Sequence, residues 1–220
     1  MNRIVSKSVK VLRERVVLFR NSDYLAINKP IGFKCSAGKA PEKKLRGLLE
    51  SMELVGYGSV PVPITSLPSD VSGVLMMSRN PAAGQLARGL IKSGQFWRCT
   101  FWGIVQGRIA QNQLSGVINI PLLNGEPNSM GPPAITHWRL LKYADHKTGQ
   151  EMSLVEFEPR TSVDDQIKLH CALTLKAPLL SVGGLHLHCM HASLPGSPNL
   201  RLVAPPTGEF LENFKYLGWV

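Results

Sequence analysis

The sequence lacks a long apolar run and has few cysteines, and both shortages limit what the protein can be. No uninterrupted apolar stretch approaches the roughly 18 residues of a membrane-spanning helix, so no membrane partner is expected. The 4 cysteines are widely spaced and form no Cys-x-x-Cys pair; they are Cys35, Cys99, Cys171 and Cys189. Without a secretory signal pattern, this spacing predicts a reducing compartment and buried thiols rather than disulfides.

Acidic residues are also scarce. The chain of 220 residues has 15 Asp and Glu against 25 Lys and Arg, which gives a net charge of +10 and a pI near 9.7. A solvated basic surface would account for part of this excess. An excess of this size on a small protein favours a polyanionic partner, and nucleic acid is the usual one.

The basic excess begins at the N-terminus. Residues 1–15 contain five basic residues and a single acid, Glu14; the basic ones are Arg3, Lys7, Lys10, Arg13 and Arg15. Two interpretations stay open, a mitochondrial targeting remnant and a basic arm that contacts RNA phosphates. We therefore treat residues 1–15 as an N-terminal arm that precedes one domain over residues 16–220.

The rest of the chain mixes strand and helix patterns without a regular alternation. Short apolar or alternating runs predict strands over 16–19, 25–27, 74–77, 96–105, 135–141, 152–157, 185–191 and 200–204. Helices are expected over 45–54, from Asn80-Pro81 to Ile91, over 163–175 and over 209–217. A chain with 44% apolar residues can bury one sizeable core. This pattern predicts a mixed α+β domain.

Several short motifs follow one another along the chain. They read Asn28-Lys29-Pro30-Ile31-Gly32, Ser72-Gly73 with an apolar run up to Ser78-Arg79, the strand 101–107, the paired strands 135–141 and 153–159, Gln166-Ile167-Lys168-Leu169-His170, and the closing strands around 185–188 and 202–206. In this order they resemble the RluA-type family of pseudouridine synthases. The resemblance implies a mixed, mostly antiparallel sheet split by a central basic cleft and flanked by helices. It also implies an RNA substrate whose target uridine is flipped out, and an activity that needs no cofactor and no metal.

The resemblance makes one absence decisive. Family members carry a His-Arg-Leu-Asp segment whose aspartate is catalytic, and the matching positions here read Thr65-Ser66-Leu67-Pro68. Proline offers no ionisable oxygen to act as nucleophile or base. The family's uracil-packing tyrosine becomes Phe101, and the arginine that pairs with its carboxylate becomes Lys168, which lacks the planar guanidinium fork. Val163-Asp164-Asp165 also replaces the family's Arg-Thr-His. No intact catalytic residue is expected.

Asp70 is the fallback acid. In an extended loop it would lie roughly 6–7 Å further along the chain than position 68. Catalytic geometry normally fails at smaller displacements. We therefore expect an inactive site, with rescue by Asp70 kept as the alternative.

Binding residues are predicted from charge and from the resemblance. The expected RNA-binding residues are Lys29, Lys39, Lys43, Lys44, Arg46 and Lys168. A metal site among His186, His188, Cys189 and His191 is the competing interpretation of the late strand. On a strand, His186 and His188 would share one face, with Cys189 and His191 on the other, which argues against a closed zinc site. No metal and no small-molecule cofactor are expected.

Three functions remain in order of preference. The first is an inactive pseudouridine-synthase homologue that binds RNA as a structural or assembly factor on a large ribosomal RNA. The basic N-terminus favours a mitochondrial ribosome over a cytoplasmic location. Ribosomal or ribosome-assembly proteins would be its further partners. The second is an active uridine-to-pseudouridine isomerase with a relocated acid, and the third is a protein-interaction module whose old cleft no longer meets RNA.

Overall fold

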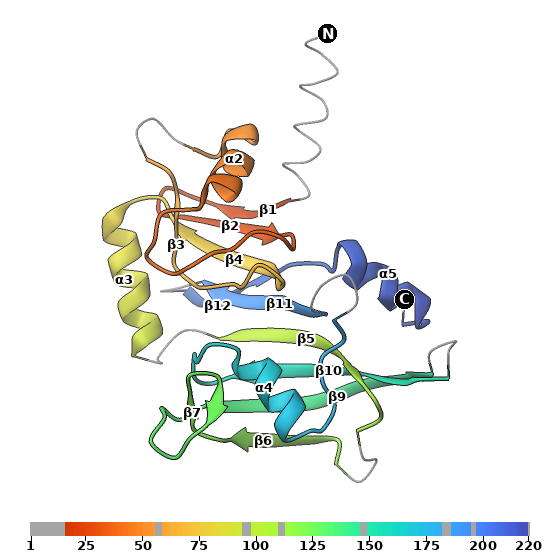
Figure 1. The fold of residues 1–220 in the computed structure, drawn as a ribbon. Coiled ribbons are helices and arrows are strands. Elements are labelled where there is room, and N and C mark those ends of the chain that lie inside the picture. The colour runs from red at the N-terminus through yellow and green to blue at the C-terminus, as the bar shows by residue number, and fades with distance from the viewer. Residues whose placement is uncertain are drawn as a thin grey trace. The chain divides into compact units, whose positions relative to one another are not determined.

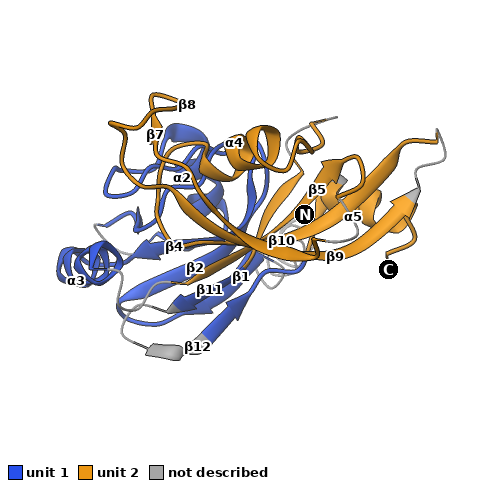
Figure 2. Ribbon diagram, turned by 90° about the horizontal axis from the view of Figure 1, so that it is seen from below, with its two compact units in different colours: residues 1–97, 191–205 blue, residues 98–190, 206–220 orange. Residues whose placement is uncertain are grey.

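A computed structural model describes residues 16–55, 59–93, 98–109, 113–145, 149–181, 186–194 and 197–219. The predicted basic arm, residues 1–15, lies outside the described residues. The chain divides into two compact units (Figure 2). Unit 1 comprises residues 1–97 and 191–205, and unit 2 comprises residues 98–190 and 206–220. The assignment of 16–220 to one domain stays a prediction.

Unit 1 is built around two buried strands. β2 (Tyr24–Lys29) and β4 (Ser72–Ser78) are buried along their whole length and pair antiparallel, from Tyr24 opposite Ser78 to Lys29 opposite Gly73. β1 (Val17–Arg20) pairs with β2 as the expected hairpin, and the short β3 (Val62–Pro63) pairs with β4. Burial on both faces is what the continuous apolar run in β4 predicts.

Two helices belong to unit 1, α2 (Lys43–Ser51) and α3 (Pro81–Lys92) (Figure 1). α3 begins as the sequence predicts: the Asn80 side chain accepts a hydrogen bond from Ala83 N at 2.8 Å, and proline occupies the first helical position. α2 begins two residues earlier than expected and ends at Ser51. Leu45 and Leu49 form its buried face, four residues apart.

Unit 2 contains an antiparallel sheet in the order β5-β10-β9-β6. Its strands are β5 (Cys99–Gln106), β6 (Ser115–Asn119), β9 (Ile135–Asp145) and β10 (Glu151–Pro159) (Figure 1). A small hairpin, β7 (Leu122–Leu123) with β8 (Glu126–Pro127), turns at Asn124-Gly125, where both residues have positive φ. Such a turn favours this Asn-Gly pair.

Two helices complete unit 2, α4 (Gln166–Leu173) and α5 (Gly208–Tyr216). Aromatic side chains of α5 and the residues after it form a buried cluster with the sheet, and Trp102 stacks on Phe214 with ring centroids 5.8 Å apart. α4 starts later than the 163–175 pattern suggests, because Asp165 adopts a left-handed conformation with φ of 56° and its side chain does not cap the helix.

β11 (Leu187–Leu194) runs through both units, since its first residues belong to unit 2 and those from His191 to unit 1. In unit 1 its end pairs antiparallel with β12 (Ser197–Val203). All the registers above are antiparallel, so the predicted α+β class with a mostly antiparallel sheet and flanking helices is confirmed. The central basic cleft stays a prediction. Among the described residues, no helix is long and apolar enough to cross a membrane.

Candidate functional site

The segment that would carry the catalytic carboxylate is an ordered surface loop of unit 1. Leu67 is buried, and its backbone exchanges two hydrogen bonds with Cys35, at 3.1 and 3.2 Å. Pro68 is exposed, and its carbonyl accepts from Val71 N at 3.2 Å in a turn. The loop therefore keeps a defined conformation around Pro68, while the side chain at this position has no group that can exchange a proton.

The side chain of Lys29 binds the Pro68 loop through hydrogen bonds. Its side chain is fully buried at 0% exposure, and its ammonium donates to three backbone carbonyls, those of Pro30 at 3.2 Å, Phe33 at 2.8 Å and Pro68 at 3.0 Å. These bonds tie the loop after β2 to the loop of Pro68. Lys29 was predicted to contact RNA, and its burial corrects this: the ammonium is committed to the protein's own carbonyls. The strand pattern concealed this because a lysine normally signals an exposed position.

Burial also changes the acid–base behaviour of Lys29. Desolvation lowers its pKa to about 8, and the neighbouring Cys35 and Asp70 raise it in opposition to that effect. Burial likewise raises the pKa of the Cys35 thiol to about 11, although the charge of Lys29 lowers it. Asp70 is half-buried and lies close enough to Lys29 to influence it electrostatically. The fallback acid is thus beside a buried cation that holds the loop.

The other two altered positions lie in unit 2. Phe101 on β5 is in register with Phe157, which is in register with Trp138 on β9. Directly opposite residues of paired strands point to the same face, so these three rings share one face of the sheet. Thr136 lies on that face too and forms hydrogen bonds with Gln166 and His170 of α4. Phe101, half-buried, and the helix that carries Lys168 therefore lie on the same side of the unit 2 sheet.

A buried polar network fixes α4. The Gln166 amide donates to Ile135 O at 3.0 Å and Thr136 Oγ1 at 2.8 Å, while its oxygen accepts from Thr161 and Val163. His170, four residues later on the same helix face, joins its Nδ1 to Thr136 Oγ1 at 2.9 Å. Burial lowers the pKa of His170, which favours the neutral ring. The network leaves Lys168 exposed. The motif that contains Gln166 and His170 did not predict that their side chains anchor α4 to β9 through buried hydrogen bonds. Their polarity and their spacing of four residues, on one face of a helix, could have suggested it.

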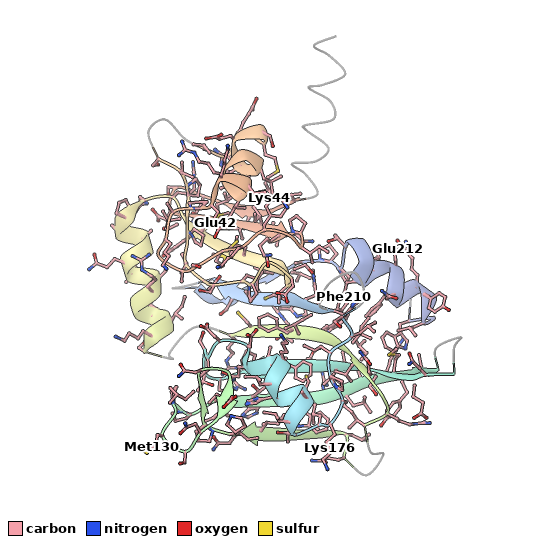
Figure 3. The ribbon with its side chains drawn as sticks, in the orientation of Figure 1. Glu42, Lys44, Met130, Lys176, Phe210 and Glu212 are labelled. Carbon is pink, nitrogen blue, oxygen red and sulfur yellow. The ribbon has the colours of Figure 1, made fainter. Side chains whose placement is uncertain are left out.

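The predicted basic residues at the start of α2 are exposed, as Figure 3 shows for Lys44 beside Glu42. Lys44 Nζ donates to Gly32 O at 3.0 Å and lies 4.9 Å from the centre of the Phe33 ring. Arg46 forms an ion pair with Glu50 at 2.8 Å. Lys39 and Lys43 are exposed on the preceding loop and at the helix start.

His186 and His188 are buried parts of unit 2, while His191 is half-buried and belongs to unit 1. His186 joins Leu180 O through Nδ1 at 3.1 Å and the Asn213 amide through Nε2 at 2.7 Å, so both ring nitrogens have partners within the protein. His186 and His188 both pack on Phe210, with ring centroids 6.2 and 5.5 Å apart. The prediction that these two histidines share a face is confirmed.

Comparisons with known proteins point to one family. The family model for RNA pseudouridylate synthase matches residues 23–173. An uncharacterized RNA pseudouridine synthase of Zymomonas mobilis is 30% identical over 179 residues, 77% of each chain. The mitochondrial pseudouridylate synthase RPUSD4 of Xenopus tropicalis is 22% identical over 78% of this chain and 60% of its own length. Bacterial dual-specificity RNA pseudouridine synthases named RluA are also similar.

Among solved structures, human RNA pseudouridylate synthase domain containing 4 superposes with a TM-score of 0.73 at 19% identity and covers 99% of this chain and 98% of its own. At this identity the likeness establishes the fold.

Proposed function

The chain belongs to the RluA-type RNA pseudouridylate synthase family, and from this premise we propose that it binds RNA without isomerising uridine. The observation that carries the proposal is Pro68, exposed in an ordered loop at the position of the family's catalytic aspartate. The chemistry requires an ionisable oxygen at the sugar and base. Phe101 and Lys168 remove a hydroxyl and a bidentate cation from two further family positions, so the three changes support one another.

Pseudouridine mapping tests the loss of activity. Large ribosomal RNA transcribed in vitro is incubated with the full chain and with Asp70→Ala, and its pseudouridines are then mapped by sequencing. We expect none with either protein, while a filter-binding assay on the same samples detects bound RNA. Pseudouridine formed by the wild-type chain and lost in Asp70→Ala would instead establish the alternative, an isomerase that uses a relocated acid.

We further propose a structural or assembly role on a large ribosomal RNA, with a mitochondrial ribosome as its site. The basic residues 1–15 and the similarity to a relative named as mitochondrial support this location. Depletion of the protein in cells should reduce assembled large subunits while the pseudouridine pattern of their RNA stays unchanged. Fractionation should place the protein with mitochondria. Loss of a specific pseudouridine on depletion would contradict the role without catalysis. A protein confined to the cytoplasm would contradict the mitochondrial location.

Protein partners are the least constrained part of the proposal. Ribosomal or ribosome-assembly proteins would place the factor on its RNA. Crosslinking in cells followed by separate recovery of RNA and protein tests this. RNA fragments of the large subunit should be recovered; a recovery of protein neighbours alone would favour the protein-interaction module instead.

A further inference from the structure

The charge of the chain is divided unequally between the two units. Unit 1 contains 16 Lys and Arg against 6 Asp and Glu, a net charge of +10. Unit 2 contains 9 of each kind, a net charge of zero. Because phosphate binding depends on excess cations, the whole excess that suggests a polyanionic partner belongs to unit 1.

The cations also differ in their partners. In unit 2, four basic side chains form ion pairs with carboxylates; the pairs are Arg108–Glu151, Arg139–Glu156, Arg160–Glu158 and Lys215–Glu212. In unit 1, the side chains of Lys34, Lys39, Lys43 and Arg88 have neither a carboxylate nor a hydrogen-bond partner among the described residues. Unpaired cations can neutralise phosphates without first giving up a protein carboxylate.

These four cations are connected through one loop. Lys34 and Lys39 lie on the loop between β2 and α2, and Lys43 begins α2. A Cβ atom added at Gly38 would lie 3.7 Å from Arg88 Cδ, so the side chain of Arg88 on α3 lies against the loop.

Backbone hydrogen bonds hold that loop in place. Gly38 N donates to Pro63 O at 2.8 Å, and Ala37 N donates to Ser66 Oγ at 3.0 Å. The backbone of the loop is therefore fixed to Pro63 and Ser66, which sets where its basic side chains leave the chain. We call Lys34, Lys39, Lys43 and Arg88 the loop surface.

We propose that the loop surface binds the phosphate backbone of RNA, and that unit 2 adds no net phosphate contact. The inference rests on the proposed RNA binding and deepens it by placing the phosphate contacts of the described residues on one surface. Phosphate contacts of this kind position a protein on RNA without reading its sequence. Lys168, which belongs to the neutral unit, is thereby removed from the phosphate-binding set.

Salt dependence measures the number of phosphate contacts. Four contacts to a single-stranded RNA give a slope of about −2.8 in a plot of log affinity against log salt, or an affinity loss of about 50-fold between 50 and 200 mM salt. The probe is a fluorescein-labelled, unstructured RNA of mixed sequence, measured by anisotropy with the full chain. A slope contributed by residues 1–15 is present in every variant and cancels in the comparison.

Two charge-matched double variants separate the units. In Lys39→Gln/Lys43→Gln the salt-dependent loss should shrink by about 7-fold relative to wild type, because two contacts disappear. Lys168→Gln/Lys176→Gln removes two exposed cations of unit 2 whose side chains have no partner among the residues that the structure describes, and should leave the wild-type slope. Thermal unfolding checks that both variants fold, and substitutions at these exposed positions are not expected to unfold the protein.

Each result decides the inference. A reduction of the slope by the unit 2 pair equal to that of the unit 1 pair overturns it, as does a slope that neither pair changes; in both cases RNA binding itself stands. A wild-type chain that does not bind the RNA removes the proposed function and the inference with it.

Discussion

Units 1 and 2 of this molecule are both antiparallel sheets with helices, but they differ in how their polar groups are satisfied. Unit 1 buries a lysine among backbone carbonyls and leaves several surface cations unpaired. Unit 2 pairs four of its basic side chains with carboxylates and buries an uncharged network around Gln166. The parts of the family scaffold that remain are those that satisfy buried groups. Pro68, whose side chain satisfies no buried group, is the position at which we propose that the chemistry was lost.

The largest effect should come from Lys29 in unit 1. Lys29→Met removes three hydrogen bonds: the carbonyls of Pro30 and Phe33 lose the ammonium, and that of Pro68 keeps only Val71 N as donor. Charged hydrogen bonds and unsatisfied buried groups together suggest a loss of about 3–5 kcal/mol in the free energy of unfolding. Urea denaturation measures it. Lys34→Met, at an exposed position of the neighbouring loop, is the matched control and should change stability by less than about 0.5 kcal/mol. Equal stability of both variants would show that the three hydrogen bonds of the Lys29 ammonium contribute little to the free energy of unfolding.

The corresponding change in unit 2 should be smaller. Gln166→Ala removes four hydrogen bonds between uncharged groups and leaves Val163 N without its acceptor, while Thr136 keeps its bond to His170 and Ile135 O keeps the donor Arg160 N. We expect a loss of about 2–3 kcal/mol by the same measurement. Asn213→Ala, which removes a side-chain contact to His186 at a half-buried position, provides a comparison within the unit. If Gln166→Ala cost as much as Lys29→Met, the proposed difference between charged and neutral networks would be wrong.

The pH dependence of the free energy of unfolding should reflect the buried titratable groups, with Lys29 of unit 1 acting in the opposite direction to the buried thiols. The pKa of Lys29 is about 8 in the folded chain and 10.5 in its ordinary state, so between these values the unfolded chain binds more protons. Lys29 alone should therefore make stability rise with pH, by about 1 kcal/mol from pH 8 to pH 9, and the buried thiols, whose ordinary pKa is 9.0, offset much of this rise. The buried thiols Cys35 and Cys171 have raised pKa values, so above pH 9 the unfolded chain binds fewer protons and stability should fall.

Urea denaturation at intervals from pH 7 to pH 10 checks this profile. Lys29→Met should abolish the rise below pH 9, and Cys35→Ala should weaken the fall above it. A free-energy difference between the wild-type chain and Lys29→Met that does not change from pH 8 to pH 9 would contradict the lowered pKa of Lys29.

The sequence predicted most elements whose pattern follows directly from burial. The β1–β2 hairpin, the doubly buried β4 and the Asn80 cap of α3 are confirmed because each depends on local residues. β6 was not predicted, since a single one of its five residues is buried and its pattern does not alternate clearly. Strand formation there depends on pairing with β9, which local patterns do not contain.

The sequence predicted which catalytic side chains the candidate site lacks better than it predicted which residues contact one another there. Proline at position 68 is readable from the sequence alone. The burial of Lys29 was not, because it depends on carbonyls of Phe33 and Pro68, the second of which lies 39 positions away. The connection of Arg88 to the loop surface was missed for the same reason: α3 and the loop meet only in the folded chain.

The smallest expected effects come from the surface ion pairs of the two units. Arg46 and Glu50 are both largely exposed, so Arg46→Gln should cost at most about 0.5 kcal/mol. Arg139 pairs with Glu156 at 2.7 Å, and the Glu156 side chain is 15% exposed and also accepts from Trp102. Because this carboxylate is less screened by water, Arg139→Gln should cost about 1 kcal/mol. High salt should narrow the gap between the variants. Equal costs at low salt would mean that the ion pairs of unit 2 neutralise its charge without stabilising its sheet.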